Sequence, residues 1–244
     1  GGRMTALRRL TIKAVIPARN EERVIGAVLR NAPDFLSAII VVDNGSDDRT
    51  AEIARTHGAT VVSEPRAGYG RACKAGVAAA LPADIILFMD ADGADDPADA
   101  GAIVAPVAAG AADLVIGSRM IGRVERGALT PAQRFGNALA CALIGAFWGV
   151  RFTDLGPFRA ISAEALARLS MDDDAYGWTA EMQARAAKQG LRVCETPVGY
   201  RRRVGKSKIS GTLRGVVMAG ATILYVVFRE RLRDGPLLRP RRRL

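Results

Sequence analysis

The densest chemistry in the sequence is a group of carboxylates in the stretch FMDADGADDP (88–97). Its acids and the one just after it are Asp90, Asp92, Asp95, Asp96 and Asp99, in a chain whose formal net charge is +10. Crowded carboxylates repel one another, so a divalent cation is the natural counter-charge. In an extended segment, side chains two residues apart point the same way, and Asp90 and Asp92 can therefore approach one ion. The stretch predicts a Mg²⁺ or Mn²⁺ site, with a solvated acidic turn as the alternative.

The second concentration of charge is basic. The run RRRVGKSK (201–208) carries five positive charges and no acid. Arginine offers paired donors to phosphate oxygens, lysine offers a point charge, and Gly205 lets the backbone close over a ligand. Because neighbouring cations repel, an anionic guest is favoured over a solvated loop. Residues 229–244 carry a further net +5, which indicates attraction to an anionic surface.

The sequence lacks the residues that several other classes of protein need. His57 is the only histidine and stands near the end of a predicted helix, so Ser–His and Cys–His nucleophiles are poorly supported. The three cysteines are scattered without a CxxC pair, which excludes a zinc ribbon and suits a reducing, cytoplasmic compartment. The basic runs carry no interleaved aromatics, so a phosphorylated ligand or the inner face of a membrane fits them better than nucleic acid.

The elements that must position these residues are predicted from the alternation of apolar and amphipathic segments. Strands are predicted at 11–17, 37–43, 59–64, 83–90 and 113–118, with helices between them. This alternation predicts an α/β fold with a mainly parallel sheet flanked by helices. In such sheets ligands gather at the carboxyl ends of the strands. The acids of 88–97 are predicted at that edge, together with Asp43 and Arg119.

The rhythm changes after residue 119, where longer apolar helices are predicted around 131–150 and 211–228. Their uncharged cores are shorter than the roughly 18–20 residues that a spanning helix needs, so we expect buried or membrane-surface helices. No linker rich in Gly, Ser and Pro interrupts the chain. We therefore expect one domain over 1–244, with two halves (10–119 and 120–228) and a basic tail (229–244).

Four stretches occur in order at the ends of successive predicted strands. They are IPARNE (16–21), VVDNGSDDRTAE (41–52), DADG (90–93) and DLVIGSR (113–119). This ordered set resembles the family 2 glycosyltransferases, which have a Rossmann-like GT-A fold. Three later stretches resemble the branch with dolichyl-phosphate mannose and glucose synthases and bacterial polyprenyl-phosphate relatives: DLGPFRAI (154–161), YGWTAEM (176–182) and PVGYRRRVGKSKISG (197–211). The resemblance covers residues 11–228, and it implies that 10–119 is the nucleotide-sugar-binding half and 120–228 the acceptor half.

The resemblance implies a nucleotide-diphosphate sugar as donor, UDP-glucose or GDP-mannose. It implies that Pro17, Arg19 and Glu21 border the nucleoside and that Asp43 hydrogen-bonds the base or ribose. A carboxylate at a strand end is suited to accept such hydrogen bonds.

The resemblance also assigns the metal. It makes Asp92 the principal contact, with Asp90 alongside, binding directly or through water, and Ala91 between them in the donor site. Dolichyl-phosphate mannose synthases read DADLQHPP, and this chain has Ala94 in place of the glutamine. Asp95 is then favoured over Asp96 as the third ligand, which stays open.

The remaining assignments concern the phosphates and the acceptor. The resemblance implies that Arg202 and Lys208 hold the donor diphosphate and acceptor phosphate, with Arg119 nearby, and that the acceptor is a polyprenyl or dolichyl phosphate. Glu181 corresponds to an acid that deprotonates hydroxyl acceptors in other members, whereas a lipid phosphate arrives ionised and needs no base. Glu181 would then bind sugar hydroxyls or orient its loop, and its alternative role is to stabilise the start of a helix.

Three rival functions stay open at this point. The transfer to lipid phosphate is expected to invert the anomeric carbon, and one rival is transfer to a soluble phosphorylated or hydroxyl acceptor instead. Another is sugar nucleotidyl transfer, although that class begins with a glycine-rich phosphate loop, which IPARNE is not. The third is a non-catalytic nucleotide-binding module.

Overall fold

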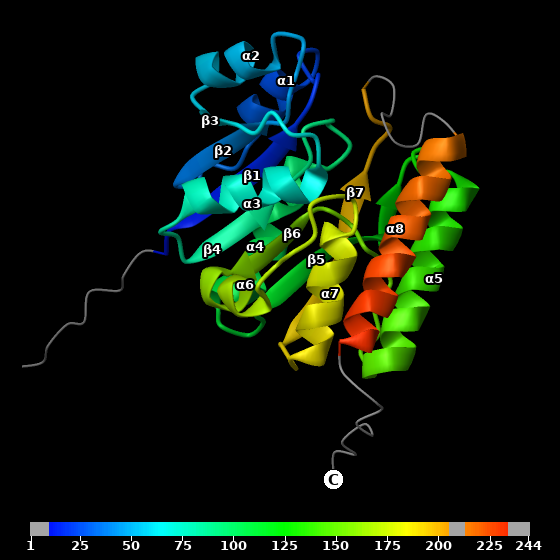
Figure 1. The fold of residues 1–244 in the computed structure, drawn as a ribbon. Helices are drawn as coiled ribbons and strands as arrows, with labels where there is room; N and C mark the ends of the chain where they lie inside the picture. Colours follow the sequence, from blue (N-terminus) through cyan, green and yellow to red (C-terminus); the bar gives the residue numbers. More distant parts are fainter. Residues whose placement is uncertain (1–9, 205–212, 234–244) are drawn as a thin grey trace, which may run out of the picture.

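The computed structural model describes residues 10–204 and 213–233, and its centre is one seven-stranded sheet (Figure 1). The strands are β1 (Ile12–Ala18), β2 (Ala38–Asp43), β3 (Thr60–Ser63), β4 (Ile85–Phe88), β5 (Leu114–Val124), β6 (Arg159–Ser162) and β7 (Val193–Tyr200). Their order is β3-β2-β1-β4-β6-β5-β7. Strands β1 to β4 are mutually parallel, β6 is antiparallel to β4 and β5, and β5 pairs in parallel with β7. The predicted mainly parallel sheet is confirmed.

Helices cover both faces of the sheet, so its central strands are apolar on both sides. One face packs against α1 (Ile25–Arg30), α2 (Thr50–Thr56) and α4 (Ala100–Ala108). The other packs against α3 (Tyr69–Ala80), α5 (Pro131–Trp148), α6 (Ala163–Leu169), α7 (Trp178–Lys188) and α8 (Leu213–Leu232). Successive residues alternate between the two cores, as a pleated strand requires: Val15 packs into the second, and Ala14 and Ile16 into the first.

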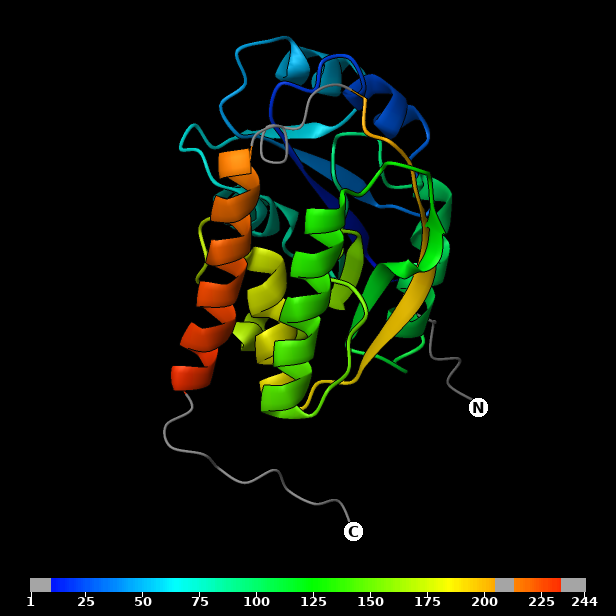
Figure 2. The ribbon, with the colours of Figure 1, turned by 90° about the vertical axis from the view of Figure 1, so that its right-hand side faces the viewer.

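Helices α5, α7 and α8 lie side by side as one group, which both ribbon views show (Figures 1 and 2). Helix α5 begins with a capping box, in which Thr130 and Gln133 satisfy each other's backbone N–H groups and Pro131 occupies the first turn. It ends at Gly149 in the left-handed conformation. In the described ranges, no helix is long and apolar enough to cross a bilayer.

Two segments differ from their sequence-based expectations. Strand β5 continues to Val124, beyond the predicted end at 118, because Arg123 and Val124 pair with Gly199 and Tyr200 after a shift in register. The segment 229–244 divides: Arg229 to Leu232 belong to α8, and 234–244 lie outside the described residues. A buried Glu230 facing a buried Arg185 at 3.0 Å explains why the helix continues.

The topology brings the carboxyl ends of β1, β2, β4, β5 and β7 to the same edge of the sheet, because only β6 runs the opposite way. The acidic loop after β4 and the basic segment after β7 therefore meet. Two backbone hydrogen bonds join them, from Arg201 N–H to Ala94 O (2.8 Å) and from Val204 N–H to Asp92 O (3.3 Å).

Candidate active site

The acidic loop after β4 forms one wall of a cavity at this edge, lined there by Asp90, Ala91 and Asp92. Tyr69, in the first turn of α3, donates from its hydroxyl to Asp90 Oδ1 at 3.1 Å. Asp92 Oδ1 accepts from Ala94 N–H at 2.9 Å, which closes a tight turn. Asp95 Oδ2 accepts from Asp90 N–H at 3.2 Å, and Asp95 Oδ1 is buried with no partner among the described residues.

Burial and mutual repulsion raise the pKa values of two acids in this loop. Burial, followed by repulsion from Asp92, raises the pKa of Asp90 to about 7. Burial and repulsion from Asp90 and Asp92 also raise the pKa of Asp95 well above its ordinary value. A divalent cation would relieve this repulsion, and the unpartnered Asp95 oxygen fits the hard-oxygen preference of Mg²⁺ and Mn²⁺.

Within the described residues, no three His, Cys, Asp or Glu side chains form a ready metal cage. That arrangement suits a cation held by one or two carboxylates, with the rest of its shell from water and a ligand's phosphate oxygens, the usual pattern for Mg²⁺.

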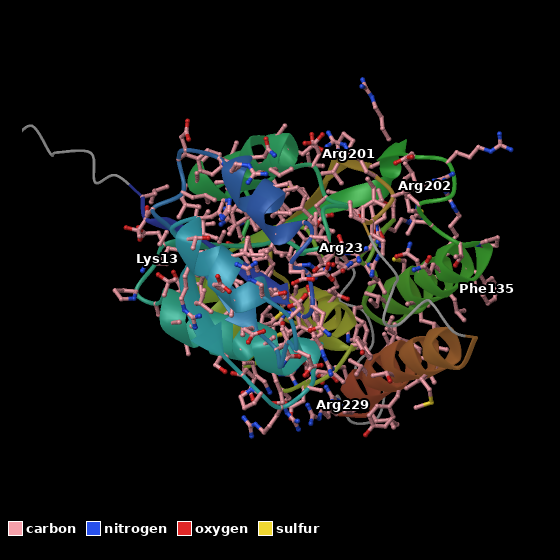
Figure 3. The ribbon with its side chains drawn as sticks, turned by 90° about the horizontal axis from the view of Figure 1, so that it is seen from above. Lys13, Arg23, Phe135, Arg201, Arg202 and Arg229 are labelled. Carbon is pink, nitrogen blue, oxygen red and sulfur yellow. The ribbon has the colours of Figure 1, made fainter. Side chains whose placement is uncertain are left out.

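The basic wall of the cavity is Arg203, which sequence analysis did not single out. An Arg203 guanidinium nitrogen lies 2.6 Å from Asp92 Oδ2. The prediction had named Arg202, but its guanidinium donates outside the cavity, to Arg126 O at 2.8 and 2.6 Å, and its backbone N–H donates to Glu125. Figure 3 labels Arg201 and Arg202 where β7 ends. Of the neighbours Arg202 and Arg203, Arg203 is the one that lines the cavity. Lys208 lies outside the described residues.

The third wall comes from the ends of β1 and β2. Of the predicted nucleoside-side residues, Pro17, Arg19 and Glu21 line the cavity. Asp43 is not among the described lining residues, and its carboxylate accepts from Ser46 N–H at 3.1 Å. The neighbouring Asn44 lines the cavity in its place.

Asn44 also shapes this wall. Its side-chain amide donates to the carbonyls of Glu64 (2.8 Å) and Arg66 (2.9 Å) and accepts from Gly68 N–H (2.9 Å). Buried with three partners, it fixes the loop between β3 and α3 against the cavity.

A fourth wall is formed by Tyr69 and Tyr176, two aromatics that sequence analysis did not assign to the site. Tyr176 belongs to the 171–177 loop, which docks on the start of α3. There the backbone N–H groups of Gly70 and Arg71 donate to the carbonyls of Ala175 (3.1 Å) and Asp174 (3.2 Å). The approach is so close that a Cβ on Gly70 would lie 2.1 Å from Asp173 O.

Arg119 and Glu181, both predicted as functional, lie behind the cavity and do not line it in the described part of the chain. Arg119 is held by Asp154 in a two-pronged ion pair. Glu181 is fully buried, and its Oε2 accepts from the N–H groups of Asp172 (3.0 Å) and Asp173 (2.9 Å). Its Oε1 lies 2.5 Å from Arg229. Both oxygens are therefore engaged in holding the 171–177 loop to α7 and α8.

Comparison with known proteins decides the family. The family model described as glycosyl transferase family 2 matches residues 13–169. The chain belongs to glycosyl transferase family 2. It is 41% identical over 210 residues to an uncharacterized glycosyltransferase of Mycobacterium tuberculosis. The aligned residues cover 85% of this chain and 94% of the relative. This confirms the predicted enzyme class.

Two further comparisons concern a second curated relative and a solved structure. A dolichyl-phosphate hexose transferase of Haloferax volcanii is 33% identical over 231 residues, 91% of this chain and 96% of the relative. Among solved structures, glucosyl-3-phosphoglycerate synthase from Mycobacterium tuberculosis, in complex with Mn²⁺, UDP and glucosyl-3-phosphoglycerate, matches with a TM-score of 0.71 at 24% identity. That match covers 91% of this chain and 80% of the synthase, and it confirms the GT-A fold.

Proposed function

We propose that this family 2 enzyme transfers a hexose from a nucleoside-diphosphate sugar to a polyprenyl-type lipid phosphate, with Mg²⁺ or Mn²⁺ as cofactor. One observation carries the donor half of the proposal: Asp90, Asp92 and Arg203 line a single cavity, with Arg203 2.6 Å from Asp92. A metal at the carboxylates and a guanidinium opposite them would grip the two sides of a diphosphate.

The residues around the cavity have distinct tasks in this proposal. Asp92 and Asp90 would hold the cation, and the buried Asp95 would add negative charge behind them. When bound, the cation would neutralise charge on the departing nucleoside diphosphate. Arg203 would donate to the diphosphate from the other side. Pro17, Arg19 and Glu21 would border the nucleoside, and the rings of Tyr69 and Tyr176 would exclude water from the sugar.

The acceptor half of the proposal rests on chemistry and on an apolar surface. Both Glu181 oxygens are engaged in structural contacts, which leaves the acid suited to a supporting role and fits an acceptor that arrives already ionised. Large apolar side chains are exposed along the α5 and α8 group: Phe135, Met218, Tyr225 and Phe228. Phe135 lies on α5, on the side away from α2 and α3 (Figure 3). Such a surface suits contact with a bilayer that carries the lipid acceptor.

Relatives support both this acceptor and one rival. The Haloferax relative is named a dolichyl-phosphate hexose transferase. The structural neighbour carries a soluble product, glucosyl-3-phosphoglycerate. Transfer to a soluble phosphorylated acid is therefore the second candidate function.

A donor and acceptor panel tests the proposal. Purified full chain is given UDP-glucose or GDP-mannose with Mn²⁺, and either undecaprenyl phosphate in detergent or 3-phosphoglycerate in buffer. The proposal expects sugar on the lipid phosphate and none on the soluble acid. Sugar on 3-phosphoglycerate alone would establish the second candidate, and nucleotidyl transfer products would refute both.

A further inference from the structure

The carboxylate that should bind the metal is already occupied by one of the protein's own cations. Asp92 Oδ2 faces Arg203 at 2.6 Å, and Asp92 Oδ1 accepts the Ala94 N–H at 2.9 Å. The Asp92 side chain is 8% exposed, so the ion pair lies at the inner end of the cavity. A cation approaching Asp92 therefore meets a guanidinium on the same oxygen.

The backbone beside Arg203 is fixed, so the side chain itself must move to release Asp92. Arg201 N–H and Val204 N–H, on either side, donate to carbonyls of the acidic loop. Just before this segment, the backbone of Tyr200 pairs with that of Asp95 in the acidic loop. The Arg203 side chain is 34% exposed, and its residue lines the cavity. It has both the freedom and the space to turn toward a ligand.

Arginine cannot leave Asp92 by losing a proton, because a guanidinium stays charged at any physiological pH. A competing anion in the cavity can draw it away from Asp92. A diphosphate in the same cavity is such an anion, and it also supplies oxygens to a metal on Asp92.

We propose that Arg203 is a built-in counter-ion that withholds Asp92 from the metal until a diphosphate draws the guanidinium away. This inference rests on the proposed donor site. Its consequence is cooperativity between metal and nucleotide, and the coupling is reciprocal, since each ligand must raise the affinity of the other by the same factor. Metal would then be loaded efficiently only together with the donor.

The test measures the affinity of the full chain for Mn²⁺, with and without UDP. Electron paramagnetic resonance reports the concentration of free Mn²⁺. The variant is Arg203→Gln. The matched control is Arg201→Gln, which removes an arginine two residues away that pairs with Asp96 at 2.5 Å instead of Asp92. Circular dichroism of both variants checks that they are folded.

Without UDP, Arg203→Gln should bind Mn²⁺ roughly five- to tenfold more tightly than wild type, the scale of one partly buried ion pair. Arg201→Gln should stay within about twofold of wild type because its partner is a different carboxylate. UDP should tighten Mn²⁺ binding more in wild type than in Arg203→Gln.

Two results would overturn the inference: Mn²⁺ affinity of Arg203→Gln equal to or below wild type, or an equal gain in Arg201→Gln, which would reveal a general charge effect. Sugar transfer is assayed separately. If the folded protein transfers no sugar but Arg203→Gln alone gains Mn²⁺ affinity, the proposed function is refuted. The inference that Arg203 is a counter-ion to Asp92 would then still stand.

Discussion

Arg119 holds the fully buried carboxylate of Asp154 through three hydrogen bonds: from Nε at 2.8 Å, from Nη2 at 2.7 Å and from its backbone N–H at 2.8 Å. The Arg119 guanidinium also lies 5.0 Å above the ring of Tyr200. Tyr200 is the last residue of β7, the strand that leads into the segment carrying Arg203. The Arg119–Asp154 pair therefore supports the cavity's basic wall from behind, a positioning role in place of the phosphate contact expected from sequence.

Asp154→Asn tests this support. It leaves the Arg119 guanidinium, on a side chain only 14% exposed, without its counter-charge, so the free energy of unfolding in urea should fall by about 3–5 kcal/mol. The matched control is Asp113→Asn, because Asp113 pairs with an Arg192 whose side chain is 58% exposed. That variant should lose less than about 1 kcal/mol. Equal losses in the two variants would refute the positioning role.

The crowded acids predict an unusual dependence of stability on pH. The pKa of Asp90 rises from 3.8 to about 7 on folding. Between those values the folded state binds more protons than the unfolded state, so the stability of metal-free protein should fall as pH rises through this window. Asp90→Asn should flatten the fall when unfolding is measured in EDTA at pH 5 and pH 8. Mn²⁺ affinity should rise over the same window, since the metal needs the ionised carboxylate. Stability that rises with pH in both proteins would contradict this assignment.

The contact between α3 and the 171–177 loop predicts the effect of a single methyl group. Gly70→Ala would place a Cβ 2.1 Å from Asp173 O, so the loop that carries Tyr176 must shift. We expect a loss of about 1–3 kcal/mol in stability together with weaker binding of UDP by calorimetry. Gly101→Ala is the control, because its Cβ would meet only Phe35 at 4.0 Å on a helix. It should be neutral or stabilising by up to about 1 kcal/mol. If both variants bind UDP as wild type does, the contact between α3 and the loop does not position the UDP site.

Glu181→Gln separates support from catalysis. Burial raises the pKa of Glu181, and two N–H groups and two arginines surround its carboxylate. Losing that charge should cost about 2–4 kcal/mol of stability, while kcat per folded molecule stays within about threefold and its pH profile is unchanged. Glu164→Gln, on the exposed surface of α6, should change stability by less than about 0.5 kcal/mol. A kcat loss of about 10² or more in Glu181→Gln would mark a general base.

The sheet could be predicted from sequence because its strands obey local rules. Val15 and Ile86 lie in short apolar runs bounded by turn residues. When such runs alternate with helices, few folds other than a parallel sheet covered by helices on both faces fit the pattern. The acidic loop was predicted for a related reason, because a strand end fixes where Asp90 and Asp92 stand.

The basic wall was harder to predict, because it depends on which side chain faces the cavity and on contacts between residues far apart in the sequence. Arg202 and Arg203 are chemically identical neighbours, and only the pairing of β7 with β5 and with the acidic loop decides which one faces the cavity. Tyr176 presented the same difficulty. It reaches the site through contacts between α3 and a loop about a hundred residues later in the chain, a separation that local pattern does not encode.

The most direct test of the central claim is donor consumption by the Asp92→Asn variant under limiting Mn²⁺. If a cation on Asp92 stabilises the leaving diphosphate, the variant should stay folded and consume UDP-glucose or GDP-mannose at least about 10²-fold more slowly than wild type. Asp96→Asn, whose carboxylate pairs with Arg201 and accepts from Ala98 N–H, should remain within about threefold of wild type. Wild-type turnover by Asp92→Asn under the same metal limitation would contradict the account.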